Sequence, residues 1–256
     1  LYDDVGSWKA KNRFFREMKE AGIEVYPFGE VKFAALSQRV NYRNHRKVVI
    51  VDGEVGYIGG MNVAERYYKG VSWGQWRDTH LRIDGMAVNA LQMSFFVDWY
   101  YATRELVSNA VYFPKVSRQG NTDMQIVTSY PMGEWKSIMQ GLLQVISQSR
   151  RYLYIQTPYF LPTEPILMAL RNAALAGVDV RLMVPRRGDS LLADLASHSY
   201  YKEAMTAGIK IYQYEAGYLH SKVVLADDNF VTVGSTNIDF RSFEHNFEIN
   251  AFIYDP

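Results

Sequence analysis

Apolar and polar positions along this chain predict strands separated by helices. Residues 47–51 and 222–226 are nearly unbroken apolar runs, which is typical of strands buried on both faces of a sheet. Residues 152–157 form a third apolar strand, and 165–176 read as a helix of about a dozen residues, long enough for a crossover connection. The pattern therefore predicts an α/β fold with mainly parallel sheets and helices on both faces.

One segment of the chain occurs twice. Residues 45–62 and 220–237 both read H-x-K-x4-D-x6-G-[G/S]-x-N, and every shared position is offset by 175 residues. The sequence before each copy also matches, since 15–26 and 201–212 each read as a helix-like stretch, a glycine and a strand. An internal repeat of this length indicates two similar structural units.

We therefore expect two pseudo-symmetric α/β/α sandwich lobes packed face to face, over residues 1–121 and 122–256. The strand and helix at 152–157 and 165–176 of the second lobe have no counterpart in the first. The chain also has no initiator methionine. On these grounds we expect the first lobe to be truncated at its N-terminus and the second at its C-terminus, with a membrane anchor upstream.

The amino-acid composition limits which partners the protein can bind and which catalytic groups it can use. The 28 Lys and Arg residues nearly balance the 27 Asp and Glu, and a net charge of +1 argues against a nucleic-acid binder, which usually has a clear basic excess. The absence of cysteine excludes disulfides, thiolate nucleophiles and cysteine-based metal sites. No apolar run reaches the roughly 18 residues that a membrane-spanning helix needs.

The repeated motif places complementary polar groups together. Residues two apart on a strand point to the same face, so each copy presents an imidazole beside an ammonium group, and an amide returns to them after a hairpin. These groups are His45, Lys47 and Asn62 in the first copy and His220, Lys222 and Asn237 in the second. The motif aspartates, Asp52 and Asp227, join the catalytic candidates, although their position at strand ends favours a role in fixing the turn.

This two-copy pattern resembles the phospholipase D superfamily, and the resemblance implies a mechanism. One histidine attacks phosphorus and forms a phosphohistidine, while the other protonates the leaving oxygen and then deprotonates the incoming alcohol or water. The first-motif histidine is commonly the nucleophile in that family, which assigns this role to His45 and the acid role to His220. Lys47, Asn62 and their second-copy equivalents would hold the phosphate oxygens, and no metal or other cofactor is needed.

The family also uses a later carboxylate to orient each histidine. Glu248 lies 28 residues after His220 and matches that position. The residue 28 positions after His45 is Trp73, so the first copy departs from this spacing, and Asp78 is the candidate there. Asp78 could instead be a structural partner of Arg77.

Several stretches resemble the bacterial cardiolipin synthases within that superfamily, among them 60–64, 76–80, 98–103, 156–160 and 234–242. The resemblance implies that two phosphatidylglycerol molecules are joined into cardiolipin with release of glycerol. It also implies other glycerophospholipids and the membrane surface as partners, no nucleic acid, and a place at the bacterial cytoplasmic membrane.

Two other hypotheses about the function stay open. A hydrolase or nuclease of the same superfamily would cut the same type of bond with the same histidines, and the near-neutral charge argues against a nuclease. A non-catalytic module that only binds anionic lipid is the second alternative, although both histidine–lysine pairs are intact. No residue decides between transfer and hydrolysis.

Overall fold

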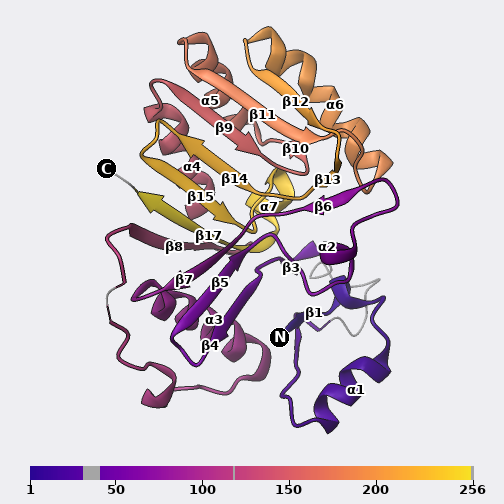
Figure 1. Ribbon diagram of the computed structural model, residues 1–256, viewed down its shortest axis with the longest axis vertical. Helices are drawn as coiled ribbons and strands as arrows, with labels where there is room; N and C mark the ends of the chain where they lie inside the picture. The colour runs from indigo at the N-terminus through magenta and orange to yellow at the C-terminus, as the bar shows by residue number, and fades with distance from the viewer. Residues whose placement is uncertain (31–40, 118, 255–256) are drawn as a thin grey trace.

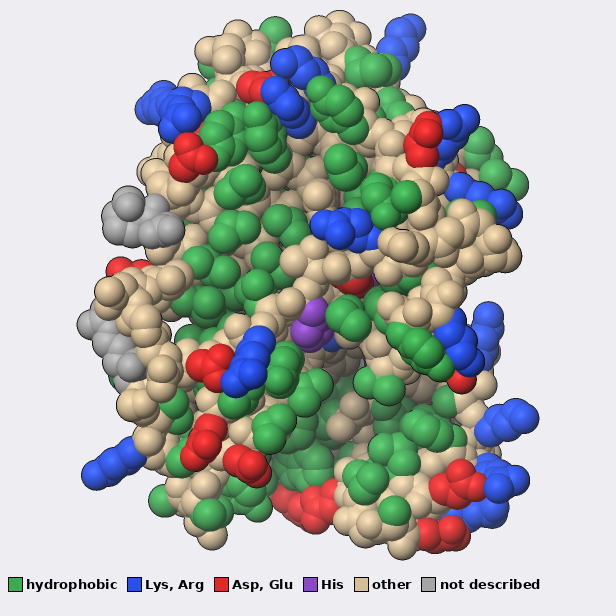
Figure 2. Space-filling model, in the orientation of Figure 1, with side chains coloured by type: hydrophobic (Ala, Val, Ile, Leu, Met, Phe, Trp, Pro, Cys, Tyr) green, Lys and Arg blue, Asp and Glu red, His purple; other side chains and the backbone are tan. Residues whose placement is uncertain are grey.

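Two groups of strands, one from each half of the chain, meet along the middle of the molecule (Figure 1). The structure is a computed structural model that describes residues 1–30, 41–117 and 119–254. Figure 2 shows hydrophobic side chains on both sides of a histidine near the middle of one face, with charged side chains of both signs scattered around them.

The second half of the chain builds the larger sheet. Its strands in spatial order are β12 (Lys210–Tyr214), β11 (Asp179–Pro185), β9 (Tyr152–Gln156), β14 (Val223–Ala226), β15 (Phe230–Gly234), β17 (Asn246–Tyr254) and β8 (Asp123–Ser129), and β3 (Arg43–Asn44) joins β17 from the first half. Strands β9, β11 and β12 are parallel. The pairings β9–β14, β14–β15, β15–β17 and β17–β8 are antiparallel, whereas β3 pairs parallel with β17, so the sheet is mixed.

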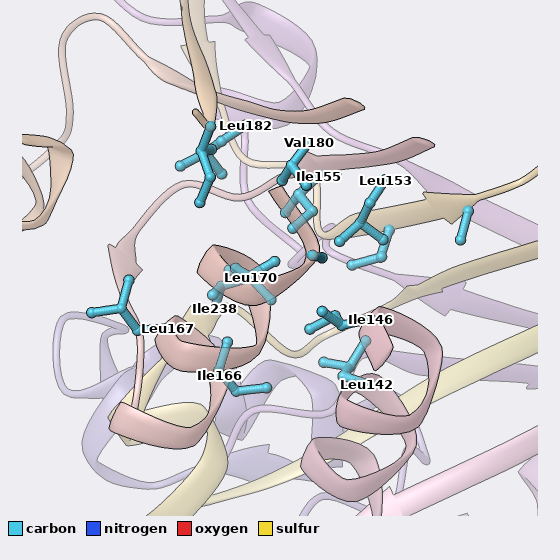
Figure 3. Close-up of a cluster of buried hydrophobic side chains, with 14 of the residues drawn as sticks. Leu142, Ile146, Leu153, Ile155, Ile166, Leu167, Leu170, Val180, Leu182 and Ile238 are labelled. Atoms are coloured by element: carbon cyan, nitrogen blue, oxygen red, sulfur yellow. The ribbon is translucent and has the colours of Figure 1, made fainter. Parts of the chain in front are cut away.

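Helices cover one face of this sheet, and the main hydrophobic core lies between these helices and the sheet. The helices are α4 (Ser137–Gln148), α5 (Glu164–Leu175) and α6 (Leu191–Thr206). Leu153 and Ile155 of β9 point toward Leu142 of α4 and Leu170 of α5, and all four are at most 2% exposed (Figure 3). Because alternate side chains of a strand share a face, these apolar positions form one continuous layer.

Truncating Leu153 to alanine is expected to lower the free energy of unfolding by about 2–5 kcal/mol, because the surrounding side chains cannot fully collapse onto the cavity. Leu153 is 0% exposed, whereas Leu175, at the end of α5, is 69% exposed. Leu175→Ala is therefore the matched control, with an expected loss below about 1 kcal/mol. Urea denaturation of both variants measures the difference, and equal losses would contradict the assigned core.

The first half builds a three-stranded antiparallel sheet, β4 (Val48–Val51), β5 (Val55–Gly59) and β7 (His80–Asp84), followed by α3 (Ala87–Thr103). Ile58 of β5 and Leu91 of α3 pack in one buried cluster with Ile249 and Ala251 of β17. The two sheets therefore pack face to face across a shared core, and the expected two-lobed α/β architecture is confirmed.

The remaining elements are short. They are β1 (Tyr2–Asp3), η1 (Val5–Ser7), α1 (Asn12–Glu20), β2 (Pro27–Phe28), α2 (Arg66–Lys69), β6 (Gln75–Arg77), η4 (Ala110–Tyr112), β10 (Phe160–Leu161), β13 (Gly217–Leu219), β16 (Ile238–Asp239) and α7 (Phe240–Glu244). The strand expected at the end of 15–26 does not form there: after α1 the chain is irregular up to residue 26, and β2, which pairs with β1, begins at Pro27. In the described ranges, no helix combines the length and apolarity needed to cross a bilayer.

The two motif strands have different surroundings despite their matching sequences. Val49 of β4 is 51% exposed, whereas its counterpart Val224 of β14 is 5% exposed within the helix-covered core. Strand β14 pairs with β9 on one side, while β4 has a strand neighbour only in β5 among the described residues. The division of the chain at residue 121 stays a prediction.

Candidate active site

Each motif histidine is positioned by a short strand that pairs with the other half of the chain. Strand β3 runs parallel to the start of β17, and the His45 N–H donates to the Phe247 carbonyl at 2.9 Å. Strand β13 runs parallel to β6 in the same way, and the His220 N–H donates to the Arg77 carbonyl at 2.7 Å. These two equivalent pairings bring the two copies of the motif together.

The same pairings give each histidine a carboxylate from the other copy. His45 Nδ1 lies 2.9 and 3.0 Å from the two carboxylate oxygens of Glu248, the residue after Phe247. His220 Nδ1 lies 2.7 Å from Oδ2 of Asp78, the residue after Arg77. Both carboxylates were predicted from the sequence, but each was assigned to the histidine of its own copy of the motif. In the structure each carboxylate contacts the histidine of the other copy, and we call these contacts crossed.

Glu248 is a fully buried carboxylate surrounded by donors. Its side chain is 0% exposed and accepts hydrogen bonds from the Asn246 amide at 3.0 Å and from the Ser235 hydroxyl. Burial alone would raise its pKa, but the hydrogen bonds and the charges of His45 and Lys47 outweigh burial and hold the pKa below its ordinary value. Glu248 therefore remains an anion.

Asp78 occupies the equivalent place beside His220 in a less stabilising environment. Burial raises its pKa to about 6, although the charge of Lys222 and a hydrogen bond from the Thr79 N–H at 2.7 Å oppose the increase. A Cβ built on Gly60 would lie 2.1 Å from Asp78 Oδ1, so the first copy needs glycine where the second has Ser235. Among the described contacts, Asp78 pairs with His220 and not with the guanidinium of Arg77.

The two motif lysines are buried cations that complete the group. Each Nζ donates to the carbonyl of its own histidine at 2.5 Å, Lys47 to His45 and Lys222 to His220. Burial lowers the pKa of Lys47 to about 8 and that of Lys222 to about 7, and carboxylates from both copies partly offset the decrease. The lysines, histidines and carboxylates therefore form one electrostatic cluster.

Both histidines are suited to act through Nε2. Burial lowers the pKa of His45, against the attraction of Glu248, and lowers the pKa of His220 well below its ordinary value. A neutral imidazole that donates its Nδ1–H to a carboxylate keeps a lone pair on Nε2. The His45 side chain is 25% exposed and that of His220 10%, so His45 is the more accessible ring.

The two motif asparagines occupy different environments. Asn237 is 5% exposed, and its amide donates to Asp239 at 3.0 Å. Asn62 is exposed, and its amide donates to the Tyr67 hydroxyl at 2.8 Å. Their predicted contact with phosphate stays a prediction.

The motif aspartates lie at the opposite end of their strands from the histidines. Asp227 accepts hydrogen bonds from the backbone N–H groups of residues 150–152 at 2.6–2.9 Å. Partial burial would raise its pKa, but these donors outweigh it and hold the pKa below its ordinary value. Asp52 is exposed, and both aspartates adopt positive φ angles, 55° for Asp52 and 52° for Asp227. The structure thus places them in turns and does not bring them to the histidines.

Sequence reasoning missed two residues that support the site. Arg46, between His45 and Lys47, donates to Asp98 of α3 at 2.6 Å and to the Glu248 carbonyl at 3.1 Å, and so ties the motif to both halves. A charged residue directly before an apolar strand could have indicated a buried partner. Tyr67 lies 3.4 Å from His220 Nδ1 through its hydroxyl, and no spacing rule in the sequence marks it.

The chain is similar in sequence to known cardiolipin synthases. The family described as "Cardiolipin synthase, PLD-like domain" matches residues 142–256. A cardiolipin synthase of Geobacillus thermodenitrificans (strain NG80-2) is 45% identical over 257 residues, which are 99% of this chain and 51% of that protein. The major cardiolipin synthase ClsA of Bacillus subtilis (strain 168) is 45% identical over 258 residues, 100% of this chain and 54% of that protein.

The chain thus spans about half the length of the curated relatives it matches. Among solved structures, the phosphatidylserine synthase of Haemophilus influenzae Rd KW20 superposes with a TM-score of 0.66 at 16% identity, over 90% of this chain and 60% of that one. At this identity the likeness concerns the fold alone.

Proposed function

Because this chain belongs to the phospholipase D superfamily and to its cardiolipin synthase branch, we propose that the protein joins two phosphatidylglycerol molecules into cardiolipin and glycerol. The observation that carries the proposal is the crossed pair of contacts, His45 with Glu248 and His220 with Asp78, beside two buried lysines. Such a site can hold one phosphodiester between a nucleophile and a proton donor. We place the protein at the bacterial cytoplasmic membrane, where these lipids reside.

In the first half-reaction, Nε2 of His45 attacks the phosphorus of the donor lipid. The phosphorus–nitrogen bond forms as the bond to the glycerol oxygen breaks, and His220 gives its Nε2 proton to that oxygen. The negative charge of the bound phosphodiester favours the protonated form of His220. Glycerol leaves, and the phosphatidyl group remains on His45 as a phosphohistidine.

In the second half-reaction, His220 takes the proton from a hydroxyl of the second phosphatidylglycerol. That oxygen attacks phosphorus, the bond to His45 breaks, and the electron pair returns to Nε2. The charges of Lys47 and Lys222 stabilise the additional negative charge at phosphorus in both transition states, a preorganised electrostatic effect that is often the largest in such enzymes.

The environments of the two carboxylates support His45 as the nucleophile. Glu248 remains an anion because its pKa is lowered, and it holds the Nδ1 proton of His45 so that Nε2 stays free to attack. Burial raises the pKa of Asp78 to about 6, so Asp78 is the more easily protonated of the two carboxylates. It therefore holds His220 less firmly in one protonation state, which suits a group that must give and then take a proton.

Lipid product analysis tests the proposed function. The full-length protein is incubated with phosphatidylglycerol vesicles, and cardiolipin and glycerol should appear in equal amounts. Phosphatidic acid alone would mean a hydrolase, and cleavage of single-stranded DNA without added metal would favour a nuclease. Binding to the vesicles with no product of any kind would favour the non-catalytic module.

The pH dependence of kcat/KM is expected to be bell-shaped. Asp78 becomes charged above its pKa of about 6, so activity should rise as pH increases through that value. Lys222 and Lys47 lose their charges as pH rises through about 7 and about 8, so activity should fall over that interval. Initial rates of glycerol release from phosphatidylglycerol, whose leaving group needs protonation, measure both limbs, and a flat profile between pH 6 and 9 would count against these assignments.

A further inference from the structure

Beside the catalytic cluster, two arginines lie over the faces of two tryptophans. The guanidinium carbon of Arg66, in α2, is 4.9 Å from the centroid of the Trp76 ring. That of Arg187, in the loop after β11, is 4.3 Å from the centroid of the Trp73 ring. Trp76 lies in β6 and Trp73 lies just before that strand, so the two halves of the chain each contribute one arginine to this segment.

This arrangement borders His220 in particular. The Trp76 ring is a neighbour of both groups: its centroid lies 5.3 Å from that of the His220 imidazole and 4.9 Å from the guanidinium carbon of Arg66. The charge of Arg66 also contributes to the lowered pKa of His220, after burial and the charges of Lys222, Lys47 and His45. Arg66 and the proposed acid and base therefore share one indole ring as a neighbour.

Both arginines are exposed and, among the described residues, neither forms an ion pair with a carboxylate. The acidic residues of the adjoining loops are engaged elsewhere: Glu65 binds Lys69 at 2.7 Å, Glu215 binds Arg186, and Asp189 accepts the Tyr159 hydroxyl at 2.7 Å. A guanidinium held on an aromatic face keeps its N–H groups in a fixed fork, which suits bidentate binding of phosphate.

We propose that Arg66 and Arg187 bind the phosphate of the acceptor lipid, the phosphatidylglycerol whose hydroxyl receives the phosphatidyl group. This rests on the proposed function, in which the reacting phosphate lies at the lysines and His220 deprotonates the acceptor hydroxyl. That hydroxyl must lie at His220, and only the glycerol headgroup separates it from the acceptor's own phosphate. A second anion site is therefore needed next to His220. Arg66 lies over Trp76, the ring beside His220, and Arg187 lies over Trp73, three residues earlier in the same segment.

Loss of these arginines should slow the reaction with an acceptor that has a phosphate but not the reaction with a neutral acceptor. Water and glycerol have no phosphate, so their attack on the phosphohistidine does not need these arginines. The wild-type full-length protein and the variants Arg66→Gln and Arg187→Gln are assayed on phosphatidylglycerol vesicles for two products: cardiolipin, and phosphatidylglycerol that has incorporated labelled glycerol. Arg104→Gln is the matched control, because Arg104 is exposed and lies 5.6 Å over Tyr101, at the end of α3.

Each site variant is expected to lower the rate of cardiolipin formation roughly tenfold, as loss of a charge-assisted hydrogen bond would. Glycerol exchange should stay within about twofold of wild type, which also shows that the variants fold and bind the donor. The control should leave both rates unchanged. Equal loss of both reactions would assign the arginines to the donor phosphate, and no loss of either would remove them from lipid binding, so each result overturns the proposal. Wild-type glycerol exchange without any cardiolipin would instead overturn the proposed function, and the acceptor site with it.

Discussion

Replacement of His45 by asparagine is expected to lower kcat/KM on phosphatidylglycerol by on the order of 10⁵–10⁶, because the variant has no nucleophile to form the covalent intermediate. His220→Asn should cost less, roughly 10²–10⁴, since a general acid contributes about that much. Product formation by each variant measures the two losses. A phosphodiester with a p-nitrophenol leaving group separates the roles further, because that group departs without protonation.

On the p-nitrophenol substrate, His220→Asn should release the first equivalent of p-nitrophenol at nearly the wild-type rate, whereas His45→Asn should stay inactive. His198→Asn is the matched control, because His198 is an exposed residue of α6 outside the cluster, and its activity should not change. A first equivalent released by His45→Asn but not by His220→Asn would reverse the two assignments.

Replacement of Glu248 by glutamine is expected to lower kcat about 10³–10⁴-fold, comparable to the loss when a buried carboxylate that fixes a catalytic histidine's tautomer becomes an amide. The glutamine amide can donate toward Nδ1 and so favour a proton on Nε2, where His45 needs its lone pair. Steady-state kinetics of Glu248→Gln and of the matched variant Asp78→Asn measure the effect.

The crossed geometry also predicts which pairs are energetically coupled. In double-mutant cycles on the free energy of unfolding, Glu248→Gln with His45→Asn should show a coupling of about 0.5–3 kcal/mol, as residues in contact do. Glu248→Gln with His220→Asn should be additive within about 0.5 kcal/mol. Coupling in the second cycle alone would mean that each carboxylate serves the histidine of its own copy.

The sequence allowed the candidate catalytic groups to be proposed because the repeat contains each of them twice. It did not allow their pairing to be predicted, because strand periodicity gives the face of a side chain but not which edges meet between lobes. The contacts of His45 with Glu248 and of His220 with Asp78 depend on the pairings β3–β17 and β13–β6, which extend over two and three residues because β3, β6 and β13 are that short. Such short strands leave almost no pattern in a sequence.

The repeat also suggested more symmetry than the structure has. Asn62 and Asn237 share a motif position, yet Asn62 is exposed and Asn237 is buried. The amide of Asn62 donates to the Tyr67 hydroxyl, whereas the amide of Asn237 donates to Asp239. The ion pair between Arg46 and Asp98 is likewise confined to the first copy, since the second has Ser221 at the position of Arg46. Equal motif letters therefore predicted the chemistry of the groups but not their surroundings.

Trapping the intermediate shows whether the two copies of the motif form one site in which His45 carries the phosphoryl group. The His220→Asn variant is mixed with the p-nitrophenol phosphodiester, quenched at alkaline pH and analysed by peptide mass spectrometry. Because this variant lacks the base for the second half-reaction, we expect the phosphohistidine adduct to accumulate on the peptide that contains His45. An adduct on any other residue, or none while p-nitrophenol is released in a burst, would contradict this assignment.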